Sequence, residues 1–193
     1  MIMEQPRTDH PQKEIRAVYD EHTIRVYQAF NNVISAEATG LQRFGSHFSM
    51  GRMTWIKPSF LWMMYRCGWA TKEGQERVLA IDIKREGFDK AVSSAVISSY
   101  REDCGMTREQ WQKLVKTSDV RVQWDPEKDI NGNNLPYRSI QLGLRGRAVE
   151  DYVNDWIVRI TDITDRVREL DSLRRSGTDI SGMLPGERVY EVR

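Results

Sequence analysis

The segment 52–71 gathers residue types that can bind a phosphorylated ligand. Lys57 lies between Ile56 and Pro58, just ahead of a run of apolar and aromatic side chains that is typical of a buried helix. A lysine at such a helix start adds its charge to the free amide groups there, and together they can hold a phosphate. The alternative is a structural salt bridge. The same segment offers a second cation, a hydroxyl and two aromatic rings: Arg52, Thr54, Trp55 and Tyr65.

Acid and amide side chains form a second group. The stretch 123–127 reads Gln-Trp-Asp-Pro-Glu and puts Asp125 and Glu127 at the end of an expected strand, where loops often hold catalytic groups. The alternative is a turn in which Asp125 caps its own backbone. On the strand expected over 137–144, Ser139 and Gln141 share one face because side chains alternate along a strand. This pair predicts the polar wall of a cleft.

The common local signatures of nucleotide, dinucleotide and zinc sites are missing from the sequence, which has no Walker loop, Gly-x-Gly-x-x-Gly, His-Glu-x-x-His or Cys-x-x-Cys pattern. The histidines His10, His22 and His47 are scattered, so we expect no metal site. Cys67 and Cys104 do not resemble the dense disulfide framework of small secreted domains, and we expect both to be reduced thiols.

Composition narrows the class of protein. The 193 residues suit one domain, which we place at residues 14–193 after a flexible N-terminal tip at 1–13. With 29 basic and 28 acidic side chains the net charge is +1, which argues against a general nucleic-acid coat or a membrane-surface binder but leaves a local basic patch open. No apolar stretch has the length of a signal peptide or a membrane span, so we expect a cytoplasmic protein without membrane contacts.

Strand and helix patterns alternate irregularly along the chain. Strands are expected at 23–29, 53–56, 77–83, 120–124, 137–144 and 157–160. Helices are expected at 35–42, 58–67, Phe88–Tyr100, 108–116, 148–156 and 165–173. The nearly continuous apolar run at 77–83 predicts a central strand covered on both faces, and the turn residues at 131–134 predict a hairpin. Without a regular βαβ repeat, a mixed sheet is favoured over a doubly wound parallel one.

Several residues are expected to mark helix ends. Asn31 or Asn32 should cap the first helix, and Pro58 should lie in the first turn of the second. Thr107 and Gln110 have the spacing of a capping box at the start of the helix expected at 108–116. Thr164 should cap the last helix.

Longer motifs resemble a known family along almost the whole chain. They are IRAVYDE, VYQAF, MTWIKPSFLWMMYRCGWATK, GQERVLAIDI, VQWDPE, RSIQLGLRG, ITDIT and LPGERVY. Together they are similar to a bacterial and fungal family known as a domain of unknown function. The resemblance implies no activity.

The order of elements is more distantly similar to the catalytic domain of ADP-ribosyltransferases. VYQAF corresponds to the first strand of that domain, ISAEATGLQRF to its helix, MTWIKPSFLWMMYRCGWA to its middle motif and second helix, and RVLAIDI to the next core strand. The resemblance implies a single α+β domain with a mixed, split β-sheet flanked by helices. It also implies NAD as a co-substrate, bound in the cleft of the split sheet.

The residues that carry the family's chemistry match only in part. Gln28 stands where the family has His or Arg, Thr54 stands near the Ser or Thr of the middle motif, and Gln141 stands where a Glu fixes the ribose. A glutamine can hydrogen-bond a ribose hydroxyl, but it cannot offset developing positive charge as a carboxylate does. Either Glu127 or Asp125 therefore supplies the acid, or the domain binds a nucleotide without transferring ADP-ribose.

The leading hypothesis is an ADP-ribosyltransferase-like domain that binds NAD or a related nucleotide and modifies a nucleic acid or a protein. Its catalytic candidates are Gln28, Glu127 and Gln141. Its cofactor-binding candidates are Arg52, Thr54, Trp55, Lys57 and Tyr65.

Two other classes remain open from sequence. A non-catalytic module can bind RNA or DNA by stacking a base on tryptophan and following the backbone with arginines, here Arg121, Arg138, Arg145 and Arg147. The balanced net charge argues against this class. The third class is a structural or partner-binding protein whose tryptophans only build the core.

Overall fold

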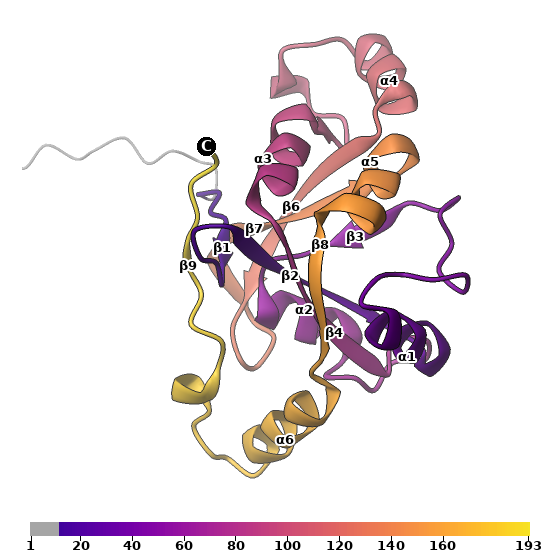
Figure 1. Cartoon of the computed structure of the whole chain (residues 1–193). Helices are drawn as coiled ribbons and strands as arrows, with labels where there is room; N and C mark the ends of the chain where they lie inside the picture. The colour runs from indigo at the N-terminus through magenta and orange to yellow at the C-terminus, as the bar shows by residue number, and fades with distance from the viewer. Residues whose placement is uncertain (1–11) are drawn as a thin grey trace, which may run out of the picture.

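β4 (Arg77–Lys84) is the central strand of the computed structural model, which describes residues 12–193 (Figure 1). It pairs antiparallel with β2 (Thr23–Phe30) on one side and with β8 (Ile157–Asp162) on the other. Alternate β4 side chains pack into two separate hydrophobic clusters, one holding Leu79, Ile81 and Ile83 and the other Val78 and Ala80. The prediction of a strand buried on both faces is confirmed.

A second sheet has the strand order β3-β7-β6-β5. β6 (Val120–Lys128) and β7 (Asn134–Leu144) form the predicted hairpin, and β3 (Thr54–Ile56) pairs antiparallel with β7. β5 (Val96–Ile97) lies parallel to β6 at the edge. A two-stranded sheet of β1 (Arg16–Ala17) and β9 (Arg188–Val189) brings the first and last described segments together.

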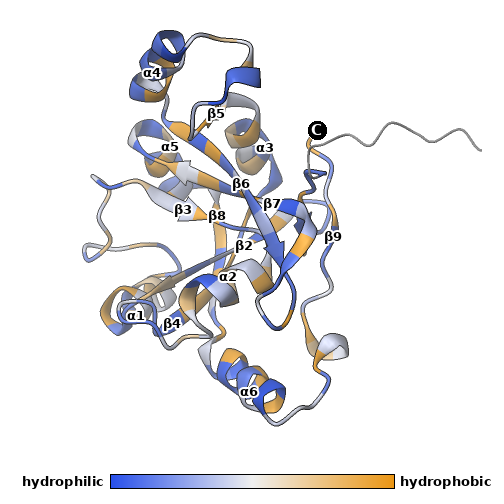
Figure 2. Cartoon of the chain, turned by 180° about the vertical axis from the view of Figure 1, so that it is seen from behind, coloured by the Kyte–Doolittle hydropathy of each residue, from blue (hydrophilic) through white to orange (hydrophobic). Residues whose placement is uncertain are grey.

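Helices cover both sheets and complete an α+β fold. They are α1 (Asn32–Leu41), α2 (Phe60–Cys67), α3 (Arg85–Ser94), α4 (Arg108–Thr117), α5 (Gly146–Asp151), which continues into a π-turn (Tyr152–Trp156), and α6 (Thr164–Arg175). Figure 2 shows hydrophobic residues along the central strands and hydrophilic residues on the outer turns of α4 and α6, which lie at opposite ends of the molecule. Within the described residues, every helix is too short or too polar to cross a membrane.

The helix caps agree with the sequence at two places and differ at two. Asn31 accepts a hydrogen bond from the amide of Ile34, and Thr107 forms the predicted capping box. Pro58, however, precedes the cap Ser59 instead of lying in the first turn of α2. Thr164 is the first residue of α6, after the cap position Ile163, and its hydroxyl accepts the amide hydrogen of Val78 on β4 instead of one from the helix.

The helix predicted over Phe88–Tyr100 is wrong at its C-terminal end. α3 ends at Ser94, and the two β-branched residues that follow form the edge strand β5. Ser93 and Ser94 donate their hydroxyl hydrogens to the carbonyls of Asp89 and Lys90, a pattern that weakens helix continuation. Pairing with β6 then outweighs the helical preference of the segment.

Two hydrogen bonds fasten the start of the described chain to β7. The amide of Arg138 donates to the carbonyl of Gln12 at 2.8 Å, and the amide of Glu14 donates to the carbonyl of Arg138 at 3.0 Å. Of the tip predicted to be flexible over 1–13, residues 1–11 lie outside the described part of the chain.

The two larger sheets meet where β2 passes the end of β3. The amide of Tyr27 donates to the carbonyl of Lys57 at 2.7 Å, in an isolated antiparallel bridge. This bridge holds the first half of the domain against the β6–β7 hairpin, and a crevice follows the junction.

Alanine substitutions at two helical glycines, one packed and one open, should change the free energy of unfolding in opposite directions. A Cβ at Gly87 on α3 would lie 2.5 Å from the indole of Trp156, whereas a Cβ at Gly40 on α1 would meet nothing within 4 Å. We expect Gly87→Ala to lower the free energy of unfolding by about 1–3 kcal/mol. Gly40→Ala should raise it by roughly 0.5–1 kcal/mol through helix propensity. Urea denaturation of both variants measures the difference, and equal effects would contradict the packing of α3 on the π-turn.

Candidate functional site

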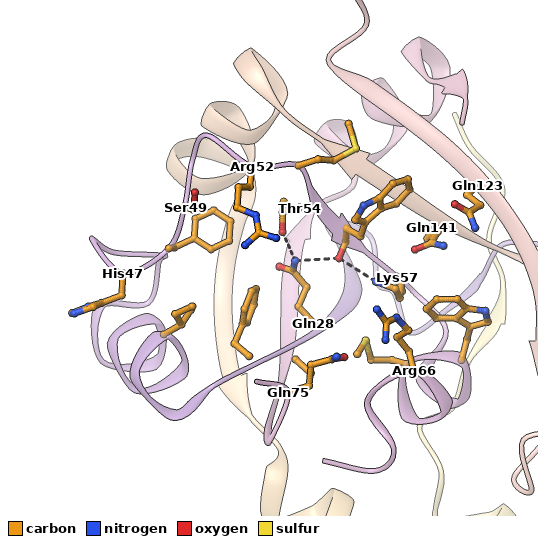
Figure 3. A pocket seen from close by; sticks show the side chains of 18 residues that line it. Gln28, His47, Ser49, Arg52, Thr54, Lys57, Arg66, Gln75, Gln123 and Gln141 are labelled. Carbon is orange, nitrogen blue, oxygen red and sulfur yellow. Dashed lines mark hydrogen bonds between the residues drawn. The ribbon is translucent and has the colours of Figure 1, made fainter. Parts of the chain in front are cut away.

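A cavity of about 630 Å³ opens at the junction of the two sheets, between β2, β3, β7 and α2 (Figure 3). Its size is typical of small-molecule sites. Six of the eight residues predicted for the site line it: Gln28, Arg52, Thr54, Trp55, Lys57 and Gln141. They come from three segments far apart in the sequence, so the fold brings them together.

The cavity wall has an excess of positive charge. Arg52, Lys57, Arg66 and His47 line it, and the lining includes no aspartate or glutamate. His47 lies at the rim, where its Nδ1 is 3.2 Å from the carboxylate of Glu37. Among the described residues, the guanidinium groups of Arg52 and Arg66 have no hydrogen-bond or ion-pair partner, and no three His, Cys, Asp or Glu side chains are grouped to hold a metal. Such a wall favours an anionic ligand.

Lys57 is a buried amine without a carboxylate partner. Its side chain is 7 % exposed, and its Nζ lies 3.4 Å from the carbonyl oxygen of Trp55 and 5.3 Å from the ring centre of Trp62. Burial, reinforced by the charge of Arg66, lowers the pKa of Lys57 to about 7. Within residues 12–193, no carboxylate lies within salt-bridge distance of this amine, so the salt bridge considered as the alternative from sequence is not formed.

The Gln28 amide joins β2 to β3 and to the π-turn. Its Nε2 donates to the hydroxyl of Thr54 at 2.7 Å and to the carbonyl of Trp55 at 3.1 Å, and its Oε1 accepts from the hydroxyl of Tyr152 at 2.8 Å. Both amide hydrogens are therefore used within the protein. Thr54, whose oxygen accepts one of them, keeps its own hydroxyl hydrogen for a ligand.

Gln141 is oriented by an acid on the neighbouring strand. Its Nε2 donates to one carboxylate oxygen of Asp125 at 2.6 Å, and Gln123 donates to the other at 2.8 Å. Because a carboxylate only accepts hydrogen bonds, the Nε2 of Gln141 must face Asp125, which leaves its Oε1 free to accept from a ligand hydroxyl. Asp125 is thus a member of strand β6, opposite Ser139, and does not cap a turn.

Glu127 and Tyr65 lie outside the cavity lining. Glu127 is buried behind the start of α2, where it accepts from the hydroxyl of Ser59 at 2.9 Å and where burial raises its pKa. Glu187, which accepts from the amide of Phe60 at 2.7 Å, is close enough for burial and the charge of Glu127 to raise its pKa to about 8. Tyr65 is half exposed, and the ammonium of Lys128 lies 3.8 Å from its ring centre.

The sequence interpretation missed Trp62 and Arg66 on α2. The spacing of four residues puts them on one helix face, and that face lines the cavity. Tyr65 precedes Arg66 by one residue, which turns it about 100° around the helix axis. Three further polar residues also line the cavity but were not predicted for it, although one of them opens the stretch 123–127: Ser49, Gln75 and Gln123.

The arginines considered for nucleic-acid binding are engaged within the protein. Arg121, Arg138 and Arg145 donate to backbone carbonyls of neighbouring strands and of α4, and Arg147 forms an ion pair with Asp151 at 2.7 Å. A guanidinium that satisfies backbone carbonyls has fewer donors left for phosphates. These four side chains therefore do not form a free basic track.

A family model described as a domain of unknown function (DUF4291) matches residues 14–190. No curated protein matches the chain.

We expect Lys57→Met to change the dependence of stability on pH. The pKa of Lys57 is about 7 in the folded state against 10.5 ordinarily, so between these values the unfolded chain binds more protons and wild-type stability rises with pH. The variant removes this contribution. At pH 6.5 the variant is spared the cost of burying a charged amine and should be more stable than the wild type. This advantage in the free energy of unfolding should shrink by about 2–3 kcal/mol between pH 6.5 and pH 9. Urea denaturation at both pH values measures the change, and a constant difference would contradict a buried amine of lowered pKa.

Proposed function

We propose that this chain, which belongs to the family described as a domain of unknown function (DUF4291), is an ADP-ribosyltransferase-like domain that binds NAD or a related adenine nucleotide. One observation carries the proposal: residues from β2, β3 and β7 that were expected at a nucleotide site line a single cavity, and the guanidinium groups of its two arginines have no partner within the described residues. A pyrophosphate group provides the negative charge that this wall lacks.

The cations suggest where the phosphates bind. Arg52 precedes β3 and Arg66 lies in the last turn of α2, with the amine of Lys57 buried among the lining residues. Arginine side chains bind phosphate through paired donors, and a nearby ammonium adds a point charge. We assign the pyrophosphate to these three residues.

Two polar side chains of the same cavity suit a ribose. The Thr54 hydroxyl has a hydrogen to donate, and Gln141 Oε1 can accept from a ribose hydroxyl. In a transfer reaction, positive charge develops on the ribose as nicotinamide leaves. The carboxylate of Asp125 then acts on this charge through the Gln141 amide, at a distance of one hydrogen bond. The acceptor in this proposal is a protein or nucleic-acid group.

The arrangement of elements supports the same proposal. β2, α1, β3 and α2 follow one another around the cavity, in the order that the resemblance to ADP-ribosyltransferases implies. In this proposal, the junction of the two sheets at Tyr27 and Lys57 corresponds to the cleft of a split sheet.

Trp55 closes the wall of the cavity. Its indole packs against Gly143 on β7, where a Cβ would lie 3.0 Å from the ring.

NAD and ADP-ribose should stabilise the folded protein. At a ligand concentration about a hundred times the Kd, we expect a gain of roughly 2.7 kcal/mol in the free energy of unfolding, visible as a rise in Tm. Arg52→Ala and Arg66→Ala should each weaken binding roughly 10- to 100-fold, because each removes a charge-assisted contact to phosphate. Differential scanning fluorimetry followed by isothermal titration calorimetry measures both effects.

Arg43→Ala is the matched control, because Arg43 is equally exposed but does not line the cavity. It should bind like the wild type. Absence of a shift with NAD, ADP-ribose and ATP would refute the proposal. Stabilisation by short RNA alone, with steep dependence on salt, would favour the non-catalytic nucleic-acid module instead.

Asp125→Asn should separate recognition of ribose from recognition of phosphate. Asparagine can accept from one of the two glutamines but presents its own NH2 to the other, so the Gln141 amide loses its fixed orientation. We expect the affinity for ADP-ribose to fall about tenfold, the equivalent of one hydrogen bond, while inorganic pyrophosphate binds as before. Calorimetric titration of both ligands tests this. Parallel losses for the two ligands would show that Asp125 acts on the cavity as a whole.

A further inference from the structure

The amine of Lys57 is the most unusual group in the cavity, because a buried lysine ordinarily has a carboxylate partner. Within the described residues it donates one hydrogen bond, to the carbonyl oxygen of Trp55 at 3.4 Å, and it lies 5.3 Å from the centre of the Trp62 ring. The side chain nevertheless lines the cavity. A ligand that enters the cavity therefore meets an amine that nothing in the described chain neutralises.

The surroundings keep this amine reactive near neutral pH. The titratable and charged groups that act on it are Arg66 and Cys67 of α2 and Asp125 of β6, with burial as the largest effect. At pH 7 the neutral fraction of such an amine is roughly a thousandfold larger than that of an exposed lysine, since its pKa is about 7 against 10.5. Desolvation beside a second cation is a known way to activate a lysine as a nucleophile.

We propose that Lys57 is a nucleophile that forms an imine with the aldehyde carbon of a phosphorylated aldose bound in the cavity. The class of ligand rests on the proposed function, because Arg52 and Arg66 hold the phosphate in both cases. Lys57 contacts the pyrophosphate of NAD as an ammonium, whereas it meets the aldehyde of an aldose as a neutral amine. ADP-ribose in its ring-open form has both groups. NAD has the phosphates but no aldehyde, since each of its anomeric carbons is bonded to nitrogen.

The reaction balances without any further reagent. The lone pair of the neutral Nζ attacks the aldehyde carbon, the C=O electron pair moves to oxygen, and a proton passes from nitrogen to oxygen to give a carbinolamine. Loss of one water molecule then forms the C=N bond. The step is reversible, and the aldose leaves by hydrolysis of the imine unless the imine is reduced.

Reductive trapping of the full chain tests the proposal. The protein is incubated at pH 7 with ADP-ribose or ribose 5-phosphate and sodium cyanoborohydride, whose hydride converts the imine into a stable secondary amine. Peptide mapping by mass spectrometry then locates the adduct. We expect labelling at Lys57 to exceed that of any exposed lysine about tenfold, and to rise as the pH passes through about 7.

Two variants complete the test. Lys57→Arg keeps the charge but cannot form an imine, and it should abolish the dominant adduct, whereas Lys113→Arg on α4 should leave it unchanged. Because mapping of the wild type identifies the residue by itself, the result stands even if Lys57→Arg folds poorly. Labelling spread evenly over exposed lysines would overturn the proposal.

The outcomes also separate this inference from the proposed function. If NAD raises the Tm but Lys57 is not trapped, the nucleotide site stands and the nucleophile is refuted. If Lys57 is trapped by ribose 5-phosphate but NAD neither protects it nor shifts the Tm, the nucleophile stands and the nucleotide proposal fails. Protection of Lys57 by NAD supports both.

Discussion

The amide of Gln28 is the interaction on which the cavity depends. It lies on β2, is buried, and binds Thr54, the backbone of β3 and the hydroxyl of Tyr152 at the same time. Gln28 belongs to the sheet of β2, β4 and β8, whereas its partners belong to the other larger sheet, through β3, and to the π-turn. A buried amide left unpaired costs free energy, so the three elements are held in one arrangement, and the neighbouring bond between Tyr27 and Lys57 fixes their register.

This arrangement creates a cavity that favours negative charge. Once β3 is fixed against β2, the chain leaves β3 at Lys57 and enters α2, whose inward face presents Trp62 and Arg66. The acids of the same region are placed elsewhere: Glu127 behind the start of α2, and Asp125 between two glutamines. The two arginines therefore have no acid among the residues that line the cavity, and in the proposed function the phosphates of the ligand take that place.

Local patterns in the sequence predicted the elements well, and the reasons are physical. The run at β4 is apolar on both faces, the hairpin has strong turn residues, and the Thr107 capping box depends only on neighbours in sequence. The edge strand β5 could not be predicted in this way, because its pairing partner β6 lies more than twenty residues further along the chain.

The site was predictable for the residues on regular strands and not for the rest. Gln28, Thr54 and Gln141 point where strand alternation places them. Glu127 would share a face with Asp125 on a regular strand, but a bulge between Pro126 and Lys128 shifts the register and turns Glu127 toward Ser59. Tyr65 lies one residue before Arg66 and therefore points away from the cavity. The sequence alone does not show which face of α2 lines the cavity.

The electrostatic effect of Gln141 in the folded protein therefore differs from what its residue type alone indicates. Taken alone, it replaces a carboxylate with a neutral amide and removes the charge that a transferase uses. In the structure, the amide is polarised by Asp125, whose two oxygens are occupied by Gln141 and Gln123. The negative charge lies one hydrogen bond behind the Gln141 amide, so the free Oε1 of Gln141 is a stronger acceptor than that of an isolated amide. Because both oxygens of Asp125 are bound to glutamines, its charge acts on Lys57 only at longer range, and burial remains the larger influence on the pKa of the amine.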